Sequence, residues 1–130
     1  MVKLAVDSSA IVAIMTEEPE ATTFMDKLVA ASVRQITAMN VLEARIVLTF
    51  SKGLLPETID DFLNRESVDV VPFDEALSNL AFEAYRRFGK GRHPAKLNMG
   101  DCAAYALAQA RGWPLLFKGE DFSQTDIERA

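Results

Sequence analysis

Short apolar runs alternate along the chain with longer stretches whose apolar residues recur at helical spacing. The runs have the length of β-strands, and the longer stretches have the period of amphipathic helices. The runs predict strands at residues 2–6, 34–37, 68–73 and 115–117, with an edge strand near Ile127 as a fifth candidate. The stretches predict helices at residues 9–16, 19–31, 38–52, from Pro56 onward, 74–88 and 98–110. Because the two alternate, we expect an α/β fold: a mainly parallel sheet of four to five strands with helices on both faces.

Polar residues and glycines mark the expected helix ends. Thr37, Asp74 and Asn98 stand directly before amphipathic stretches, where their side-chain oxygens can accept hydrogen bonds from free backbone N–H groups. Gly112 follows the last residue of its helix. Residues 89–100 are rich in glycine, proline and cations and have no apolar period, so we expect an exposed loop there. No linker or repeat interrupts the pattern, and residues 1–130 are expected to form one domain.

Composition narrows the class of protein. With 49% hydrophobic and 25% charged residues, the chain is expected to be soluble and globular. No apolar run approaches the length of a membrane span, and the amino terminus lacks the plan of a signal peptide, so we expect a cytoplasmic protein without membrane contact. Cys102 and His93 are the only residues of their kinds, which excludes an intrachain disulfide and a His-rich or thiolate metal site. Oxygen ligands remain, and they favour a hard cation such as Mg2+ or Mn2+.

The charge is unevenly distributed. A net charge of -5 and a pI near 4.9 argue mildly against a nucleic-acid substrate. Between Glu83 and Asp101, however, there is no acid, and the interval contains the bases Arg86, Arg87, Lys90, Arg92 and Lys96. A local basic strip can steer a phosphate backbone even on an acidic protein. The strip is therefore a candidate RNA contact, with a solvated loop as the alternative.

Four acidic residues have positions that folding alone does not explain: Asp7, Glu43, Asp101 and Asp121. Asp7 closes the first strand, Asp121 follows the last one, and Asp101 lies in the first turn of a helix. The neighbours of Glu43 at helical spacing are apolar, which places its carboxylate on an otherwise apolar stripe. Burying an unpaired carboxylate is costly, so such a side chain usually has a partner or a cation.

Each acid also has a structural interpretation. Asp7 could cap the following helix, and Asp101 could offset the dipole of its own. Asp121 could be a turn residue, and Glu43 could pair with a base such as Arg45, although adjacent helix residues point in different directions. Topology favours a shared site, because the carboxyl ends of parallel strands meet at one edge of the sheet. Acids gathered there repel one another unless a divalent cation binds or some of them hold protons.

Clustered carboxylates at that edge would form a cage of oxygen ligands. A divalent cation held there would position a phosphodiester, lower the pKa of a bound water and stabilise the leaving oxyanion. The four acids therefore predict a metal-dependent nuclease.

Several segments carry a family resemblance. Asp7-Ser8-Ser9-Ala10 ends the first strand, Glu43 lies in the third helix, and residues 98–108 are Asn-Met-Gly-Asp-Cys-Ala-Ala-Tyr-Ala-Leu-Ala. Residues 116–122 are Leu-Phe-Lys-Gly-Glu-Asp-Phe. Over essentially the whole chain, this set resembles the motifs of PIN-domain ribonucleases, specifically the VapC toxins of type II toxin-antitoxin systems.

The resemblance implies a doubly wound α/β sandwich and metal-dependent endonucleolytic cleavage of RNA, with Mg2+ or Mn2+ held by three or four acids. It also implies a homodimer and a cognate antitoxin whose C-terminal segment occupies the groove of the active site. By the same resemblance, Asp7, Glu43 and Asp101 are the core metal-binding acids, and Asp121 is the more variable fourth. Ser9 matches a hydroxyl that hydrogen-bonds within the site.

One departure and two rival functions remain open. Many relatives have a Thr and a further Asp where this chain has Phe117 and Gly119, which leaves Glu120 as a competitor of Asp121 for the fourth acid. One rival is a Mg2+-binding receiver domain of signalling systems, with Asp74 as phosphoacceptor and Lys118 as its lysine. Against it, the first strand ends in one acid where receivers have a pair. The second rival is a catalytically dead PIN-like binding module.

Overall fold

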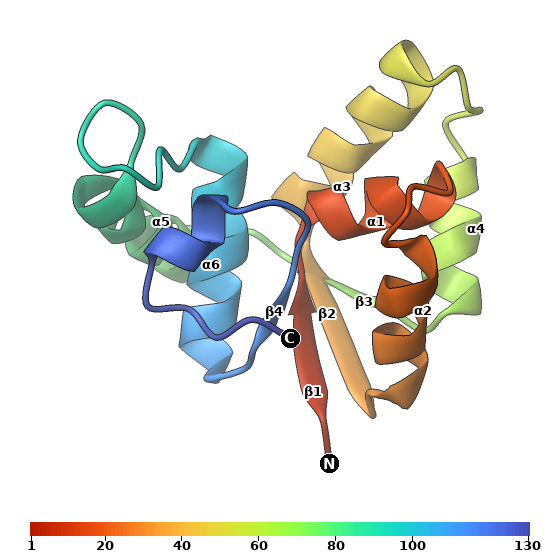
Figure 1. The fold of residues 1–130 in the computed structure, drawn as a ribbon, viewed down its shortest axis with the longest axis horizontal. Coiled ribbons are helices and arrows are strands. Elements are labelled where there is room, and N and C mark those ends of the chain that lie inside the picture. The colour runs from red at the N-terminus through yellow and green to blue at the C-terminus, as the bar shows by residue number, and fades with distance from the viewer.

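Four parallel strands form one sheet, in the order β3-β2-β1-β4. A computed structural model describes all residues from 1 to 130 (Figure 1). The strands are β1 (Lys3–Val6), β2 (Val33–Thr37), β3 (Asp69–Val71) and β4 (Leu115–Leu116). The helices are α1 (Ser8–Met15), α2 (Ala21–Ala30), α3 (Ala38–Ile46), α4 (Thr58–Arg65), α5 (Glu75–Phe88) and α6 (Met99–Arg111), with a π-helical turn η1 (Val47–Ser51) and a 3-10 turn η2 (Asp121–Gln124). The expectation of a parallel α/β sheet is confirmed.

The sheet separates two apolar cores. In Figure 1 it is seen nearly edge-on, with α5 and α6 on one side and α1 to α4 on the other. Along β1, Leu4 and Val6 pack into the core beneath α1 to α4, whereas Ala5 packs into the core beneath α5 and α6. This alternation follows from the two-residue period of a strand. Leu4, Ala5 and Val6, which are buried, are accordingly all apolar, whereas Lys3 at the start of the strand is exposed.

Three helix caps that the sequence predicts are present. The side chain of Thr37 accepts from the backbone N–H of Asn40 at 3.0 Å. Asp74 accepts from the N–H of Leu77 at 3.0 Å, and Asn98 accepts from that of Asp101 at 2.8 Å. Each bond satisfies an N–H that has no partner within its helix.

Four segments differ from the sequence-based expectation. The helix expected over residues 38–52 changes from α-helical to π-helical geometry at Val47. The third strand is shorter than expected, spanning Asp69–Val71. The loop after α5 is not wholly exposed, because Leu97 is buried in the core between α5 and α6. The expected edge strand near Ile127 is reduced to one bridge, in which Leu115 pairs with Arg129.

The parallel arrangement brings several chain segments to one edge of the sheet. Because β1, β2 and β4 are parallel, the segments that follow these three strands begin at the same edge of the sheet. The N–H of Asp7 donates to the carbonyl of Leu116 at 2.9 Å, which holds the start of the segment after β1 beside the end of β4. Active sites of open parallel sheets form at such an edge.

None of the helices combines the length and the apolar content needed to cross a bilayer.

Candidate active site

A pocket of about 340 Å³ opens at the carboxyl edge of the sheet. It contains three of the four acids that the sequence singles out, of which one lies on α3 and one on α6. The other lining residues belong to α1, the turn after α1, η1 and the segment after β4. The lining residues are Asp7, Ser8, Ser9, Val12, Glu18, Glu43, Val47, Asp101 and Lys118. The expected convergence of Asp7, Glu43 and Asp101 on one site is therefore seen at the level of the pocket.

Asp7 lines the pocket and is 2% exposed. It caps α1, since its Oδ2 accepts from the N–H of Ser9 at 3.1 Å. Its Oδ1 is buried without a hydrogen-bond partner. Burial raises the pKa of Asp7 to about 7; hydrogen bonding from Ser9 opposes this shift, and the charges of Asp101 and Glu43 add to it. The helix cap thus accounts for one carboxylate oxygen and leaves the other available for a ligand.

Glu43 is held in the pocket by polar neighbours. Its Oε1 accepts from the hydroxyl of Ser8 and, at 3.4 Å, from the side-chain amide of Asn40. The same amide of Asn40 donates to the carbonyl of Gly100 at 2.9 Å, which ties α3 to the start of α6. Asn40 is fully buried, so these bonds also satisfy an amide that has no access to water.

Gly100 allows the close approach of α6 to Glu43. A Cβ atom at this position would lie 2.3 Å from Oε2 of Glu43, closer than real contacts allow. The glycine therefore leaves the space that the carboxylate fills.

Asp101 faces the pocket from the first turn of α6. Its Oδ2 accepts from the N–H of Asn98 at 3.0 Å, and the two residues form a reciprocal capping box. Burial raises the pKa of Asp101 to about 6; the bond from Asn98 opposes the shift, and the charges of Glu43 and Asp121 add to it. Asp101 thus has a structural role in its helix, as a member of a capping box, and this role coexists with a place in the pocket.

Asp121 stands apart from the other three acids. It begins η2, is exposed and does not line the pocket, although its charge acts on Asp101. The carboxylate of its competitor Glu120 accepts instead from the hydroxyl of Ser123 at 3.0 Å. Of these two acids, Asp121 is therefore the one with an electrostatic link to the pocket.

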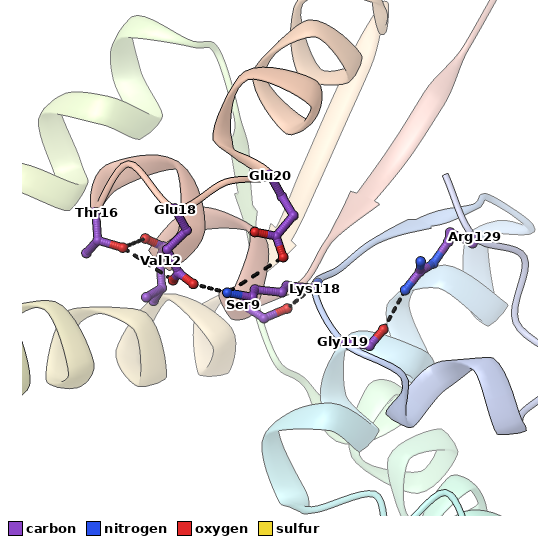
Figure 2. Close-up of polar contacts among 8 residues, drawn as sticks. All are labelled: Ser9, Val12, Thr16, Glu18, Glu20, Lys118, Gly119 and Arg129. Atoms are coloured by element: carbon purple, nitrogen blue, oxygen red, sulfur yellow. Dashed lines mark hydrogen bonds and ion pairs between the residues drawn. The ribbon is translucent and has the colours of Figure 1, made fainter.

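Ser9 connects the start of α1 to the segment after β4. Its hydroxyl accepts from the backbone N–H of Lys118 at 3.0 Å. The ammonium group of Lys118 is paired with Glu18 and lies 3.6 Å from Oε2 of Glu20 (Figure 2). Lys118 is the only basic residue that lines the pocket.

The pocket has the donor set that an oxygen-preferring divalent cation requires. Its side-chain donors are carboxylates and hydroxyls, and Asp7 contributes a buried oxygen that has no partner. As the side chains stand, no group of three or more His, Cys, Asp or Glu residues has the mutual geometry of a metal site. Hydrogen bonds to Ser8, Asn40 and Asn98 instead hold the carboxylates in their positions around the pocket.

Other candidates from the sequence lie elsewhere. Arg45 does not pair with Glu43; its guanidinium contacts both carboxylate oxygens of Asp60, at 2.7 and 2.9 Å. Asp74, the phosphoacceptor of the receiver alternative, caps α5 and does not line the pocket. His93 accepts from the N–H of Ala95 at 3.0 Å within its own loop.

The basic strip also lies outside the pocket. Arg86 pairs with Glu83 at 3.3 Å, and Arg87 pairs with Asp126 at 3.2 Å. Arg92 donates to the carbonyl of Arg86. Lys90, Lys96 and these arginines are exposed, and none lines the acidic pocket. The strip is therefore a separate surface, and its contact with RNA stays a prediction.

Sequence reasoning missed the residues that position Glu43. Asn40 precedes Glu43 by one helical turn, and this spacing of a polar residue was the available signal. The contacts of Ser8 and Gly100 with Glu43 join distant parts of the chain, and nothing in the local sequence indicates them.

Comparisons with known proteins find relatives over nearly the whole chain. Residues 4–128 match the family described as the PIN domain. Ribonuclease VapC28 of Mycobacterium tuberculosis is 42% identical to the chain over 129 residues, which cover 98% of the chain and 97% of that relative. A ribonuclease VapC of Mycolicibacterium smegmatis is 44% identical over 125 residues, which cover 95% of the chain and 97% of the relative.

Solved structures share the fold at low sequence identity. VapC20 of Mycobacterium tuberculosis, described as a sarcin-ricin loop cleaving toxin, has a TM-score of 0.78 at 17% identity and covers 98% of both chains. A DNA-bound VapBC from Salmonella typhimurium has a TM-score of 0.71 at 16% identity, covering 99% of this chain and 96% of that one. A toxin-antitoxin complex from Klebsiella pneumoniae has a TM-score of 0.70 at 13% identity, covering 95% and 92%.

Proposed function

The chain belongs to the PIN-domain family and, within it, to the VapC ribonucleases, and from this premise we propose that residues 1–130 act as one domain, an endoribonuclease that is the toxin of a toxin-antitoxin pair. The observation that carries the proposal is the pocket in which Asp7, Glu43 and Asp101 meet. A receiver domain does not account for Glu43, and Asp74 is outside the pocket. A dead binding module does not account for three acids gathered at one site.

In this proposal Asp7, Glu43 and Asp101 hold a divalent cation, Mg2+ or Mn2+, and Asp121 assists from the rim. The bound cation would supply a water of lowered pKa and offset the charge that develops on the phosphate. The chain's own contribution is positional. Ser8 and Asn40 orient Glu43, and the backbone of Asn98 orients Asp101.

The electrostatics of the pocket support a cation. Burial and mutual repulsion raise the pKa of Asp7 to about 7 and that of Asp101 to about 6. Unless a positive charge is nearby, Asp7 therefore takes up a proton near neutral pH, and Asp101 does so in mildly acidic solution. A cation that binds here displaces protons, so its affinity should rise with pH up to about neutrality.

Ser9 has an indirect part in the proposal. Its hydroxyl fixes the backbone of Lys118, and its N–H holds Asp7 in place. Ser9 therefore joins the end of β1, where Asp7 lies, to the segment after β4 that leads to Asp121. We assign it to positioning these groups.

Two protein partners belong to the proposal. Solved structures with this fold are described as a toxin-antitoxin complex and as VapBC, which supports a cognate antitoxin on another chain. A homodimer is also proposed. Large apolar side chains remain exposed, and contacts with other chains commonly cover such residues. They include Leu42, Ile46 and Phe50 on α3 and η1, Phe82 on α5 and Met99 on α6.

The test is cleavage of RNA by the purified protein in Mg2+ or Mn2+, with a chelator as control. Asp101→Asn keeps the shape of the side chain and its capping bond but removes a charge from the pocket. Loss of a residue that only supports a metal ligand lowers activity roughly 10- to 100-fold, so loss of a ligand should lower the rate of cleavage at least as much. The metal-free variant should melt at the same temperature as the parent or higher, because repulsion is relieved. Full cleavage by well-folded Asp101→Asn and Asp7→Asn proteins would overturn the proposed site.

A further inference from the structure

Lys118 occupies an unusual position in an acidic pocket. The lining residues include four acids, Asp7, Glu18, Glu43 and Asp101, and Lys118 is their only basic counterpart. An RNA strand that enters this pocket brings further negative charge. Apart from a bound cation, Lys118 is the one lining group that can attract it.

The backbone around Lys118 is fixed from two sides. Its N–H donates to the hydroxyl of Ser9, and the carbonyl of the following Gly119 accepts from the guanidinium of Arg129 (Figure 2). Arg129 also lies over the ring of Phe117, 4.2 Å from its centroid. Gly119 has a φ of +99°, a left-handed conformation that glycine adopts without strain. The turn that contains Lys118 is therefore held in a fixed conformation, with Lys118 on the lining of the pocket.

The ammonium group of Lys118 is held at the rim of the pocket. It pairs with Glu18 and lies 3.6 Å from Glu20, and both acids belong to the segment between α1 and α2 (Figure 2). The hydroxyl of Thr16 lies 3.3 Å from Oε1 of Glu18 and helps to fix that carboxylate. Lys118 keeps 35% of its side chain exposed. An ammonium has three donors, so one remains for a ligand when two face the carboxylates.

We propose that Lys118 is a phosphate-binding residue of the RNA site and that Glu18 and Glu20 hold its ammonium in place until RNA binds. This inference rests on the proposed ribonuclease function. A lysine ammonium is a compact point charge that binds phosphate oxygens. Its position on the pocket lining would hold a backbone phosphate of the substrate beside Asp7, Glu43 and Asp101. Glu18 and Glu20 compete with that phosphate for the same group.

A purely structural role makes different predictions. If Lys118 only links the turn after β4 to the segment before α2, its substitution should change the stability of the fold. RNA binding would then change only in variants that misfold. An ion pair as exposed as this one contributes little to stability. Glu18 and Lys118 would then be equivalent, and loss of either would have the same small effect.

Binding is best measured with a short fluorescent single-stranded RNA of mixed sequence, in Mg2+, on an Asp101→Asn background. Lys118→Met should weaken binding roughly tenfold and reduce the slope of log affinity against log salt by about one. Lys118→Arg should restore most of the affinity and the slope. In the active protein, Lys118→Met should raise KM more than it lowers kcat, because the contact is made before and during the reaction.

Substitution of Glu18 tests whether this carboxylate competes with RNA for the ammonium group of Lys118. Glu18→Gln should strengthen RNA binding when Lys118 is present, and it should have a much smaller effect in the Lys118→Met background. Glu17→Gln is the matched control, since Glu17 is an exposed acid of the same turn that forms no ion pair. Equal gains from Glu17→Gln and Glu18→Gln would show a general effect of charge and would contradict the competition.

The outcomes separate this inference from the proposed function. If the parent protein cleaves and binds RNA while Lys118→Met retains its affinity and salt slope, the role of Lys118 is wrong and the ribonuclease stands. If the parent neither binds nor cleaves RNA, both are wrong. A thermal melt of each variant shows whether a loss of binding reflects unfolding, and the recovery by Lys118→Arg distinguishes charge from fold.

Discussion

At the scale of single residues, the site depends on one missing side chain. Gly100 leaves room for the carboxylate of Glu43, and a Cβ there would lie 2.3 Å from Oε2. Gly100→Ala should therefore displace Glu43 from its position between Ser8 and Asn40. The atoms that this Cβ would meet are the end of a flexible side chain, so the variant should still fold, although Glu43 loses its bonds to Ser8 and Asn40.

The displacement of Glu43 should lower RNA cleavage at least about tenfold, the lower end of what loss of an outer-sphere metal partner costs. Cleavage rates and thermal melts of Gly100→Ala and of Gln109→Ala, an exposed position on the same helix, provide the comparison. A stable Gly100→Ala protein with parental activity would show that the position of Glu43 does not limit catalysis.

The two buried acids make the metal-free protein sensitive to pH. The folded-state pKa values of Asp7, about 7, and Asp101, about 6, lie above the ordinary value of 3.8. Between these limits the folded chain binds more protons than the unfolded chain, so stability falls as pH rises. In the presence of a chelator, the melting temperature should thus be higher near about pH 5 than near about pH 7.5.

Asp7→Asn should flatten this dependence and raise the melting temperature at neutral pH, because it removes the most buried of the three charges. Saturating Mg2+ should flatten it as well, since the cation replaces the protons. Melts of parent and variant over the pH range, with and without Mg2+, provide the measurement. A parent protein that becomes steadily less stable on acidification through this range would contradict the assigned environment of Asp7.

The sequence predicts the acids better than their supports. Asp7, Glu43 and Asp101 can be selected because each is a carboxylate at a strand end, in a first helical turn or on an apolar stripe. Ser8 and Gly100 cannot be selected in this way, because their importance lies in contacts with Glu43 across the chain. The sequence singles out Lys118 only as the lysine of the receiver alternative, and its pairing with Glu18 depends on the tertiary fold.

At the scale of elements, local signals fix the helix starts more firmly than the strand lengths. Thr37, Asp74 and Asn98 form the caps that the sequence indicates, because each bond is made within a few residues. The third strand is shorter than its apolar run, since strand ends depend on pairing with a neighbour, and β3 is an edge strand that pairs only with β2. Leu97 shows that a loop without helical period can still contribute an anchor to the core.

The basic strip after α5 is the element whose role remains to be tested. If it guides RNA toward the pocket, replacing two of its cations should weaken binding and reduce the salt slope by up to about two, one for each lost phosphate contact. Arg92→Ala combined with Lys96→Asn is suitable, because Lys96 has a φ of +55° and Asn tolerates that conformation.

RNA binding over a salt series on the Asp101→Asn background is the measurement, and Lys27→Ala with Arg65→Ala, exposed cations of α2 and α4, is the control pair. Metal affinity should not change. An affinity and slope equal to those of the control pair would identify the strip as a solvated loop and leave Lys118 as the main basic contact.

At the scale of the whole molecule, a parallel sheet explains how distant acids come to share a site. The alternation of runs and amphipathic stretches is sufficient to predict the sheet and its layers, because periodicity reports which faces are buried. The strand order β3-β2-β1-β4 places β1 between β2 and β4, so the junction that bears Asp7 is central to the carboxyl edge. Periodicity alone does not determine that order or which acids reach the pocket, and Asp121 remains on its outside.

If the proposed function is right, Asp7, Glu43 and Asp101 together hold a divalent cation. Anomalous diffraction from crystals soaked in Mn2+ tests it most directly, because the metal is located independently of any activity. We expect an anomalous peak in the pocket at the carboxyl edge of the sheet, with oxygens of these three carboxylates as its protein ligands, and no such peak in crystals of Asp7→Asn. A peak only at another site, or none in well-diffracting crystals of the parent soaked at neutral pH, would show that these three acids do not form a metal site.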